Sequence, residues 1–537
     1  MLFNSYVFLF AFLPVTLVVY ELLSRWAGKQ ACILWLTAAS IFFYGWWSWP
    51  FAALLVASIT FNAIIGHWLL KGRGSERQRK NTLLFGVGAN LALLGYFKYA
   101  NFLVEALSPL IPGGLQMATV ILPIAISFHT FQQIAFLIDA RHRTVKEFSI
   151  SGYFLFVTFF PQLVAGPIVH HNEMMPQYAG KDAKRITPDN LAIGLSLFAI
   201  GLFKKVILAD LTSRWADPVF AAASRGVDLS LAEAWIGTLA FTFQLYFDFS
   251  GYSDMALGLA RMLGIVLPLN FQSPYKAASI IEFWQRWHMT LTRFFNQYLY
   301  TPMTLAAVRR RAHKGFSIST RAIRDPAEFA TRLALPTIVT MTVIGIWHGA
   351  GFQFMVFGFL HGVYLTINHA WRTFRQGAKP NTWKRRLGMA TTFVAVAVSF
   401  VFFRADSLET ALRVLGPMAG SHGLSLGVGT GKALGAHAAD LAPFGVVFNG
   451  LFPNDFFSNI DSMGVWMVIL FILVIVAPST YDLFRSEGIA LQVGVRADEV
   501  GRLVWRRTAA WGLATGVMLC LAILQIQTLK PFIYFQF

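Results

Sequence analysis

The histidine at position 348 is the residue best placed in this sequence to do chemistry. His348 follows Trp347 and stands between two apolar runs, 334–347 and 351–371. Ionisable side chains at membrane depth usually face the protein interior or a wet cavity, where they have functional roles. A neutral imidazole is a suitable general base for a hydroxyl that attacks an activated carbonyl. We therefore predict a catalytic His348; the alternative is a histidine that only hydrogen-bonds to backbone at a helix turn.

A second histidine, His288, ends the run FWQRWH, which also carries Trp284, Arg286 and Trp287. The surrounding stretch 279–303 has aromatic and aliphatic side chains at helical spacing, with polar residues on the other side. This pattern predicts an amphipathic helix that lies in the membrane interface or lines a cavity. The tryptophans would then wall a tunnel beside His288. An interfacial anchor with no catalytic role fits the same pattern.

Two carboxylates, Asp248 and Asp254, lie within otherwise apolar sequence. Each would be costly facing lipid. We expect both to form hydrogen bonds inside a helix bundle, and Lys204 and Lys205 are candidates to pair with them. The functional alternative is a proton or cation path.

Several other kinds of site have no support in the sequence. There is no Walker loop, HExxH or CxxC, and the GxSxG string at 423–427 lacks the strand and helix that give it meaning. Four other histidines show no metal-ligand spacing, and we predict that they are structural and that the protein has no metal site: His67, His129, His170 and His171. His361 and His369 are eight positions apart, too far for a shared ligand on adjacent turns, and we expect them to make packing or headgroup contacts. The two cysteines, Cys32 and Cys520, predict no disulfide framework.

The composition is that of an integral membrane protein. Of 537 residues, 56% are hydrophobic and only 13% are charged, whereas soluble domains average about 25% charged residues. The net charge of +18 comes from short basic clusters between apolar blocks. Such clusters are typical of cytoplasmic loops, so we expect membrane lipids and no nucleic acid as partners.

The apolar blocks predict an all-α polytopic protein with about 12 transmembrane helices. The predicted spans are 6–24, 31–48, 51–70, 82–106, 117–138, 190–209, 231–250, 334–347, 351–371, 388–405, 464–480 and 508–527. Two interrupted stretches, 151–170 and 253–266, are expected to be re-entrant or interfacial. The connections poor in Lys and Arg place both termini outside the cytosol. We expect a single domain, 1–537, with an extracytoplasmic loop at 406–463.

An ordered set of motifs resembles the membrane-bound O-acyltransferase (MBOAT) family, in its alginate O-acetyltransferase branch. The strongest matches are Tyr246–Asp254, Phe283–His288 and Ile346–Gly349, and weaker ones include Pro161–Ile168 and Asn270–Phe271. Gln285 departs from the family, which often has a basic residue there, and this puts donor contacts at that position in doubt.

The resemblance implies a ring of helices around a central funnel, with His348 as the family's catalytic histidine and His288 as its second histidine. It also makes Asn270 a site candidate and, with Trp347, Trp284, Trp287, Arg286 and Asp248, completes the expected substrate-binding set. The family moves acyl groups from a cytosolic thioester to a hydroxyl. No cofactor is expected to stay bound; acetyl-CoA or another acyl thioester would be the donor substrate.

In this branch the acceptor is an exopolysaccharide, served by periplasmic acetyl-transfer proteins, and the location is the bacterial inner membrane. Two other functions remain open. D-alanyl transfer to teichoic acid uses the same family architecture. A polysaccharide transporter or channel should show paired charges in broken helices with repeat symmetry; here Asp248, Asp254 and Lys204 supply charge, but the sequence has no repeat.

Overall fold

The computed structural model describes residues 1–533 except 73, 113, 116, 181–184, 317, 376–380, 453–462, 492–502 and 527–529. Part of the predicted loop 406–463 therefore lies outside the described residues. The chain forms two compact units. Unit 1 comprises Met1–Val206, Phe249–Asn270 and Thr480–Phe537, and unit 2 comprises Ile207–Asp248 and Phe271–Ser479. The expectation of a single domain stays a prediction.

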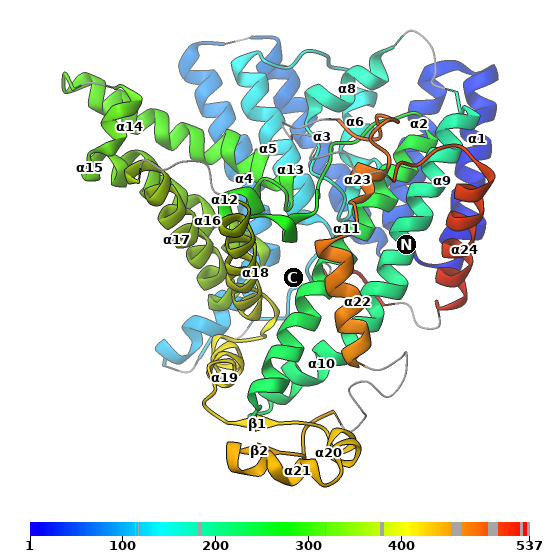
Figure 1. Cartoon of the computed structure of the whole chain (residues 1–537). Coiled ribbons are helices and arrows are strands. Elements are labelled where there is room, and N and C mark those ends of the chain that lie inside the picture. The colour runs from blue at the N-terminus through cyan, green and yellow to red at the C-terminus, as the bar shows by residue number, and fades with distance from the viewer. Residues whose placement is uncertain are drawn as a thin grey trace. The chain divides into compact units, whose positions relative to one another are not determined.

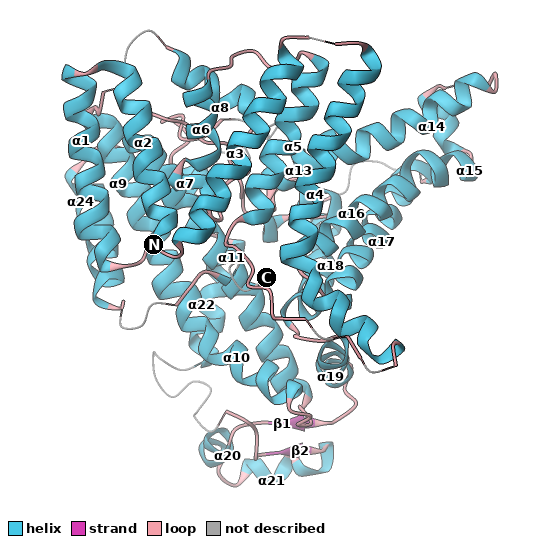
Figure 2. Ribbon diagram, turned by 180° about the vertical axis from the view of Figure 1, so that it is seen from behind, coloured by secondary structure: helices cyan, strands magenta, loops and turns pink. Residues whose placement is uncertain are grey.

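Nearly all the regular structure is helical (Figures 1 and 2). Unit 1 contains η1 (Phe8–Phe12), α1 (Leu13–Trp26), α2 (Gly28–Gly45), α3 (Trp49–Leu70), α4 (Glu76–Leu107), η2 (Ser108–Leu110), α5 (Ile126–His142), α6 (Ile150–Thr158), α7 (Phe160–Leu163), α8 (His171–Ala179), α9 (Pro188–Phe203), α23 (Thr480–Leu483) and α24 (Ala509–Leu524). Two elements cross between the units in the chain, η3 (Lys204–Ala209) and α11 (Leu231–Met262).

Unit 2 contains α10 (Asp210–Ser224), η4 (Pro274–Lys276), α12 (Ile280–Trp284), α13 (Met289–Phe295), η5 (Asn296–Tyr300), α14 (Thr301–His313), η6 (Thr320–Arg324), α15 (Pro326–Phe329), η7 (Ala330–Ala334), α16 (Leu335–His348), α17 (Phe352–Phe374), α18 (Thr382–Arg404), α19 (Leu408–Met418), α20 (Val428–Leu434), α21 (His437–Asp440), η8 (Ala442–Phe444) and α22 (Met463–Ile475). The strands of the described chain are β1 (Leu424–Ser425) and β2 (Val446–Val447), which pair in parallel.

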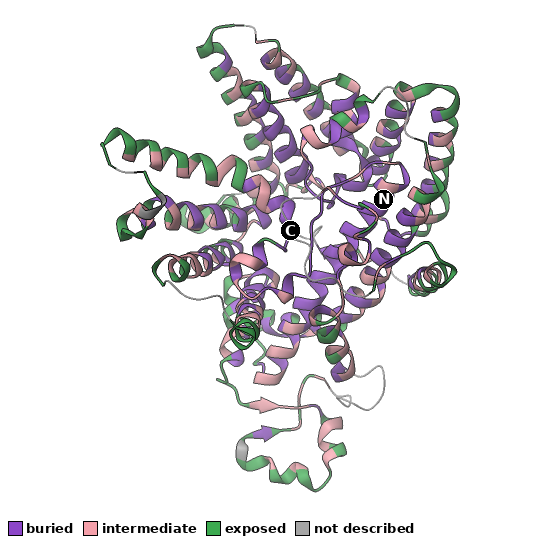
Figure 3. Ribbon diagram, turned by 45° about the horizontal axis from the view of Figure 1, so that its top comes forward, coloured by how far each residue is buried: buried purple, intermediate pink, exposed green. Residues whose placement is uncertain are grey.

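The helices have the surface of a membrane protein. Among the described residues, six helices are long and apolar enough to span a bilayer, and α22 and α24 are shorter apolar helices. Large apolar side chains stay exposed on these helices, including Phe10, Leu84, Phe85 and Leu513. Figure 3 shows exposed positions along many of the helices. In water such surfaces would be unfavourable, whereas lipid accepts them. The predicted polytopic all-helical fold is confirmed.

Every predicted span coincides with a helix, but one span boundary and two other predictions were wrong. The stretch 253–266 is not a separate re-entrant segment, because α11 continues without a break from Leu231 to Met262. The span predicted at 117–138 becomes helical only at Ile126. The single amphipathic helix predicted over 279–303 is interrupted between α12 and α13.

Helices α9 and α11 approach closely within unit 1 because glycines face each other across the contact. A Cβ atom on Gly194 would lie 2.6 Å from the Gly258 oxygen, and one on Gly201 would lie 2.5 Å from the Gly251 oxygen. Glycines at such interfaces let backbones meet without a hydrophobic driving force between the helices. Near this contact Lys204 donates to Asp254 at 2.6 Å, which confirms the predicted pairing of a lysine with one of the two acids.

Gly258→Leu should therefore prevent α9 and α11 from packing. Overfilling a close-packed contact costs about 1–3 kcal/mol or more, and here the obstacle is backbone. We expect a fall in the yield of monodisperse protein in detergent and in its thermal midpoint. Gly88→Leu on α4 is the matched control, since no atom lies within 4 Å of a Cβ built there. Equal stability of the two variants would contradict this packing.

In unit 2, α16 and α17 form a tight antiparallel hairpin, and α18 packs beside α17 (Figure 1). A Cβ on Gly345 would lie 2.2 Å from the Phe354 oxygen, and one on Gly358 would lie 2.3 Å from the Met341 oxygen. The hairpin turns at the Gly349–Gly351 segment, immediately after His348. The close backbone contact thereby fixes the position at which His348 ends its helix.

Candidate active site

His348 lies at the last position of α16, where it is buried by aromatic rings from neighbouring helices of unit 2. It is 4% exposed. Its ring centroid lies 5.1 Å from Phe403 of α18 and 5.9 Å from Phe357 of α17, both in edge-on geometry. The next residue has to be a glycine, Gly349, because a Cβ atom there would lie 2.2 Å from the ring of Phe354. The turn that follows His348 thus depends on small residues, and at this turn the imidazole faces the interior of unit 2.

His288 is the residue at which the predicted amphipathic helix breaks. It has a left-handed backbone (φ 43°, ψ 51°), and its carbonyl oxygen accepts the first hydrogen bonds of α13, from Leu291 and Thr292. The side chain is fully buried. A non-glycine residue in this conformation costs about 1–2 kcal/mol, and such outliers cluster at functional sites. The strain sets the direction of the imidazole and is consistent with a functional position.

The indole of Trp347 stands next to both histidines. The ring centroid of Trp347 lies 4.8 Å from that of His348 and 6.2 Å from that of His288. The fold of unit 2 thus brings His288 and His348, which are sixty positions apart in the sequence, next to the same tryptophan ring. The structure therefore groups three predicted site residues, the two histidines and Trp347.

Trp284 is held in place by His361, for which the sequence predicts only packing or headgroup contacts. Its indole N–H donates to Nδ1 of His361 at 3.2 Å, and Nε2 of His361 lies 2.8 Å from the Ser399 hydroxyl. Because Nδ1 accepts, Nε2 carries the proton and donates to Ser399, which donates in turn to the Val396 oxygen. His361 also contacts Phe357, the neighbour of His348. No rule based on sequence spacing could have predicted this series of hydrogen bonds, since the residues that form it are 77 and 38 positions apart.

Arg286 has a mainly architectural set of contacts. Its guanidinium donates to Glu282 at 2.9 Å, and the segment around Gln272 is joined to it by a backbone hydrogen bond from the Gln272 N–H to the Arg286 oxygen at 3.0 Å. The bond from Gln272 ties the loop after α11 to the α12–α13 break, whereas the bond to Glu282 stays between α12 and that break. Arg286 is 8% exposed. The predicted role of this arginine in substrate binding stays a prediction.

The other predicted residues are all buried. Trp287 of unit 2 packs on Phe400 and Phe283, with ring centroids 5.4 Å and 5.6 Å away. Asp248 is 2% exposed and belongs to unit 2, at the end of its part of α11. Asn270 is assigned to unit 1, where its side-chain amide donates to the Ser253 hydroxyl at 3.4 Å.

Burial lowers the pKa of His288 to about 3, so the imidazole is neutral in the folded protein at physiological pH. An unfolded chain binds a proton at this residue below pH 6.5 or so. Between that pH and about 3 the unfolded state holds more protons, so stability falls as the pH falls, by up to about 1.4 kcal/mol per unit. Thermal denaturation at pH 7.5 and pH 5 should show a larger loss for the parent protein than for His288→Asn. An equal loss would show that His288 does not have this pKa.

Both imidazoles are enclosed by protein. The predicted central funnel stays a prediction. Among the described residues, neither His348 nor His288 belongs to a group of His, Cys, Asp or Glu side chains close enough to share a metal ion.

Comparison with known proteins adds an independent finding. A model of MBOAT, the membrane-bound O-acyltransferase family, matches residues 115–319. The chain is 40% identical to a peptidoglycan O-acetyltransferase of Helicobacter pylori, over 79% of this chain and 81% of the relative. It is 35% identical to a probable alginate O-acetylase, AlgI, of Pseudomonas putida over 100% of both chains. A teichoic acid D-alanyltransferase of Streptococcus thermophilus is 27% identical over 63% of this chain and 79% of its own.

Proposed function

The chain belongs to the membrane-bound O-acyltransferase family and is an O-acyltransferase, and from this premise we propose that it transfers acetyl groups across the membrane. The donor is a cytosolic acyl thioester such as acetyl-CoA. The acceptor is a hydroxyl of an extracytoplasmic polysaccharide, or of a periplasmic protein that passes the acetyl group on. The observation that carries the proposal is the pair of buried imidazoles, His348 and His288, on one tryptophan at breaks between helices.

The thioester supplies the activation, so the protein has to provide a base and a place to react. His348 takes the proton of the acceptor hydroxyl while the oxygen of that hydroxyl attacks the thioester carbonyl carbon. The carbon–sulfur bond then breaks, and the departing thiolate receives the proton from the imidazolium. The products are an O-acetyl ester and a free thiol. A second route places the acetyl group briefly on His348 as an acyl-imidazole before the hydroxyl attacks.

The remaining predicted residues act on binding. The neutral imidazole of His288 orients the donor or shares the proton. Trp347, Trp284 and Trp287 shape the passage for the acyl group, and Arg286, Asp248 and Asn270 contact the donor or the acceptor. His361 acts through Trp284 and is a positioning residue.

The acceptor class rests on the relatives. The names of two relatives, at 40% and 35% identity, give acetylation of peptidoglycan and of alginate; both are polymers outside the cytosol. D-alanyl transfer is the second candidate, favoured only by the 27% identity to the streptococcal protein. A transporter is set aside, because the family membership makes the protein an acyltransferase.

The orientation follows from charge. The protein lies in the bacterial inner membrane, with its basic connections on the cytosolic side and both termini on the opposite side. The helix α14 carries one of these basic clusters and has no buried residue, as suits a cytosolic helix. Cysteine labelling from either side of sealed vesicles tests this arrangement.

Deletion of the gene tests the function most broadly. Ester-linked acetate should disappear from one purified polymer, the exopolysaccharide or the peptidoglycan, and return with the intact gene. Unchanged acetate in both polymers would contradict the proposal, and loss of ester-linked D-alanine would favour the second candidate.

A further inference from the structure

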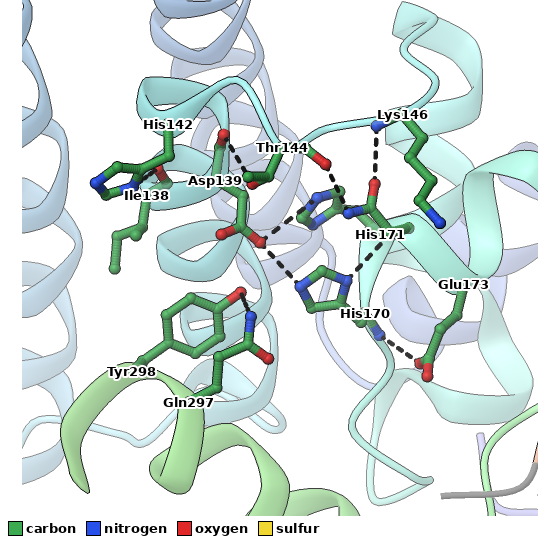
Figure 4. Close-up of polar contacts among 11 residues, drawn as sticks. Ile138, Asp139, His142, Thr144, Lys146, His170, His171, Glu173, Gln297 and Tyr298 are labelled. Carbon is green, nitrogen blue, oxygen red and sulfur yellow. Dashed lines mark hydrogen bonds and ion pairs between the residues drawn. The ribbon is translucent and has the colours of Figure 1, made fainter. Parts of the chain in front are cut away.

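Unit 1 brings together three side chains whose ligand atoms suit a metal ion. Asp139 lies near the end of α5, His170 directly precedes α8, and His171 is the first residue of α8. Oδ2 of Asp139 lies 2.9 Å from Nε2 of His170 and 3.6 Å from Nε2 of His171. One ligand atom from each residue lies within 4.8 Å of the others. Figure 4 shows the carboxylate directed at both imidazoles.

Hydrogen bonding alone explains the position of His170 in this group but not that of His171. The contact between Asp139 and His170 is an ordinary hydrogen bond, but 3.6 Å is too long for one from His171. His171 has a side chain only 1% exposed, and neither of its ring nitrogens has a hydrogen-bond partner among the described residues. Burying a polar group in this way is unfavourable by about 1–3 kcal/mol. A cation held between Asp139 and His171 would give the Nε2 atom of His171 a partner and so remove that part of the penalty.

The two distances from the Asp139 oxygen suit ligands around a first-row metal. Bonds of about 2.0–2.2 Å place neighbouring ligand atoms about 3.0–3.5 Å apart, and the two distances to Asp139, 2.9 Å and 3.6 Å, bracket that range. Two imidazoles and one carboxylate favour zinc, iron, nickel or copper over magnesium or calcium. Three protein ligands leave a position for water.

The backbone around the group is fixed by side chains of the same region. The Asn172 side chain accepts from the Lys146 N–H and donates to the Thr144 oxygen, and Glu173 accepts from the His170 N–H. These bonds tie the segment after α5 to the start of α8. Nδ1 of His170 accepts from the Asn172 N–H at 3.3 Å, a long contact that is given up when the proton of Nε2 moves to Nδ1 and frees Nε2 for a metal.

We propose that Asp139, His170 and His171 bind one divalent transition-metal ion, with Zn²⁺ as the probe, and that this ion joins the start of α8 to the end of α5. The prediction from sequence was the opposite, that His170 and His171 are structural and that no metal is bound. Adjacent histidines with an aspartate 31 positions earlier match no ligand pattern, so the group becomes visible only in the fold.

Zinc content tests the proposal on the full chain in detergent, stripped with a chelator and then dialysed against Zn²⁺. The wild-type protein should hold one equivalent of zinc and gain thermal stability from it. His171→Gln should bind zinc at least ~100-fold more weakly, since loss of supporting groups alone costs 10–100-fold, and should lose the stabilisation by zinc. Asp139→Asn keeps the shape of the hydrogen-bonded group and should show the same loss.

His142→Gln is the matched control. His142 lies on the same helix, is exposed, and bonds through Nδ1 to the Ile138 oxygen, so its removal should leave zinc content unchanged. No zinc in the wild-type protein, or an equal loss in His142→Gln, would overturn the proposal. If the ligand variants do not fold, the zinc-edge absorption spectrum of the wild type decides: two imidazoles and a carboxylate support it, and any other ligand set overturns it.

Discussion

His348→Ala should reduce acetyl transfer by about a thousandfold or more while leaving the protein folded. General base catalysis by a positioned imidazole contributes about 10²–10⁴-fold, and in this account no other group replaces it. The side chain lies at the last position of α16 and packs among rings, so its loss leaves a cavity and does not break a helix. The rate is measured with labelled acetyl-CoA in membranes that contain the polymer acceptor.

Two controls separate catalysis from packing. His369→Ala removes another histidine of unit 2, on α17, and should keep nearly full activity. Added imidazole should partly restore His348→Ala, because the cavity left by the side chain can admit a small base. Full activity in His348→Ala would end the proposed role. Loss of folding in His348→Ala would move the test to His348→Gln, which fills the same space without the basic nitrogen.

His288→Asn should reduce acetyl transfer by about a hundredfold with little change in stability. Asparagine tolerates the left-handed conformation that His288 adopts better than most residues, so this substitution removes the imidazole and keeps the break between α12 and α13. If His288 orients the donor, KM for the thioester rises; if it shares the proton, kcat falls. Steady-state kinetics with varied acetyl-CoA distinguishes the two roles.

His288→Ala is the companion variant, because alanine lacks the imidazole and is also strained in the left-handed region. It should lose the same activity and, in addition, about 1 kcal/mol of stability relative to His288→Asn. If His288→Asn keeps full activity, the imidazole has no role in the reaction. In that case the position matters only for the backbone.

The membrane fold was predictable because its signal is local. A protein that spans lipid needs long apolar helices, and each predicted span does coincide with a helix. The acid Asp254 also pairs with one of the expected lysines, Lys204. The extent of α11 was misjudged for a related reason. Its charged residues made 253–266 look interrupted, whereas inside the bundle Asp254 is paired and the helix continues.

The site was predictable in its residue types and not in its geometry. His348 and His288 stood out as histidines in apolar or aromatic sequence, but their common neighbour Trp347 and the left-handed turn at His288 arise from tertiary packing. The support of Trp284 by His361 and the group around Asp139 also join residues far apart in sequence. Hydrophobic periodicity carries no information on such pairs.

Transfer from one side of a sealed membrane to the other tests the central claim most directly. Inside-out vesicles that enclose the acceptor polymer receive labelled acetyl-CoA on the outside, which is the cytosolic face. We expect label on the enclosed polymer with the wild-type protein and almost none with His348→Gln. Equal labelling with both proteins, or transfer only when donor and acceptor share one side, would contradict it.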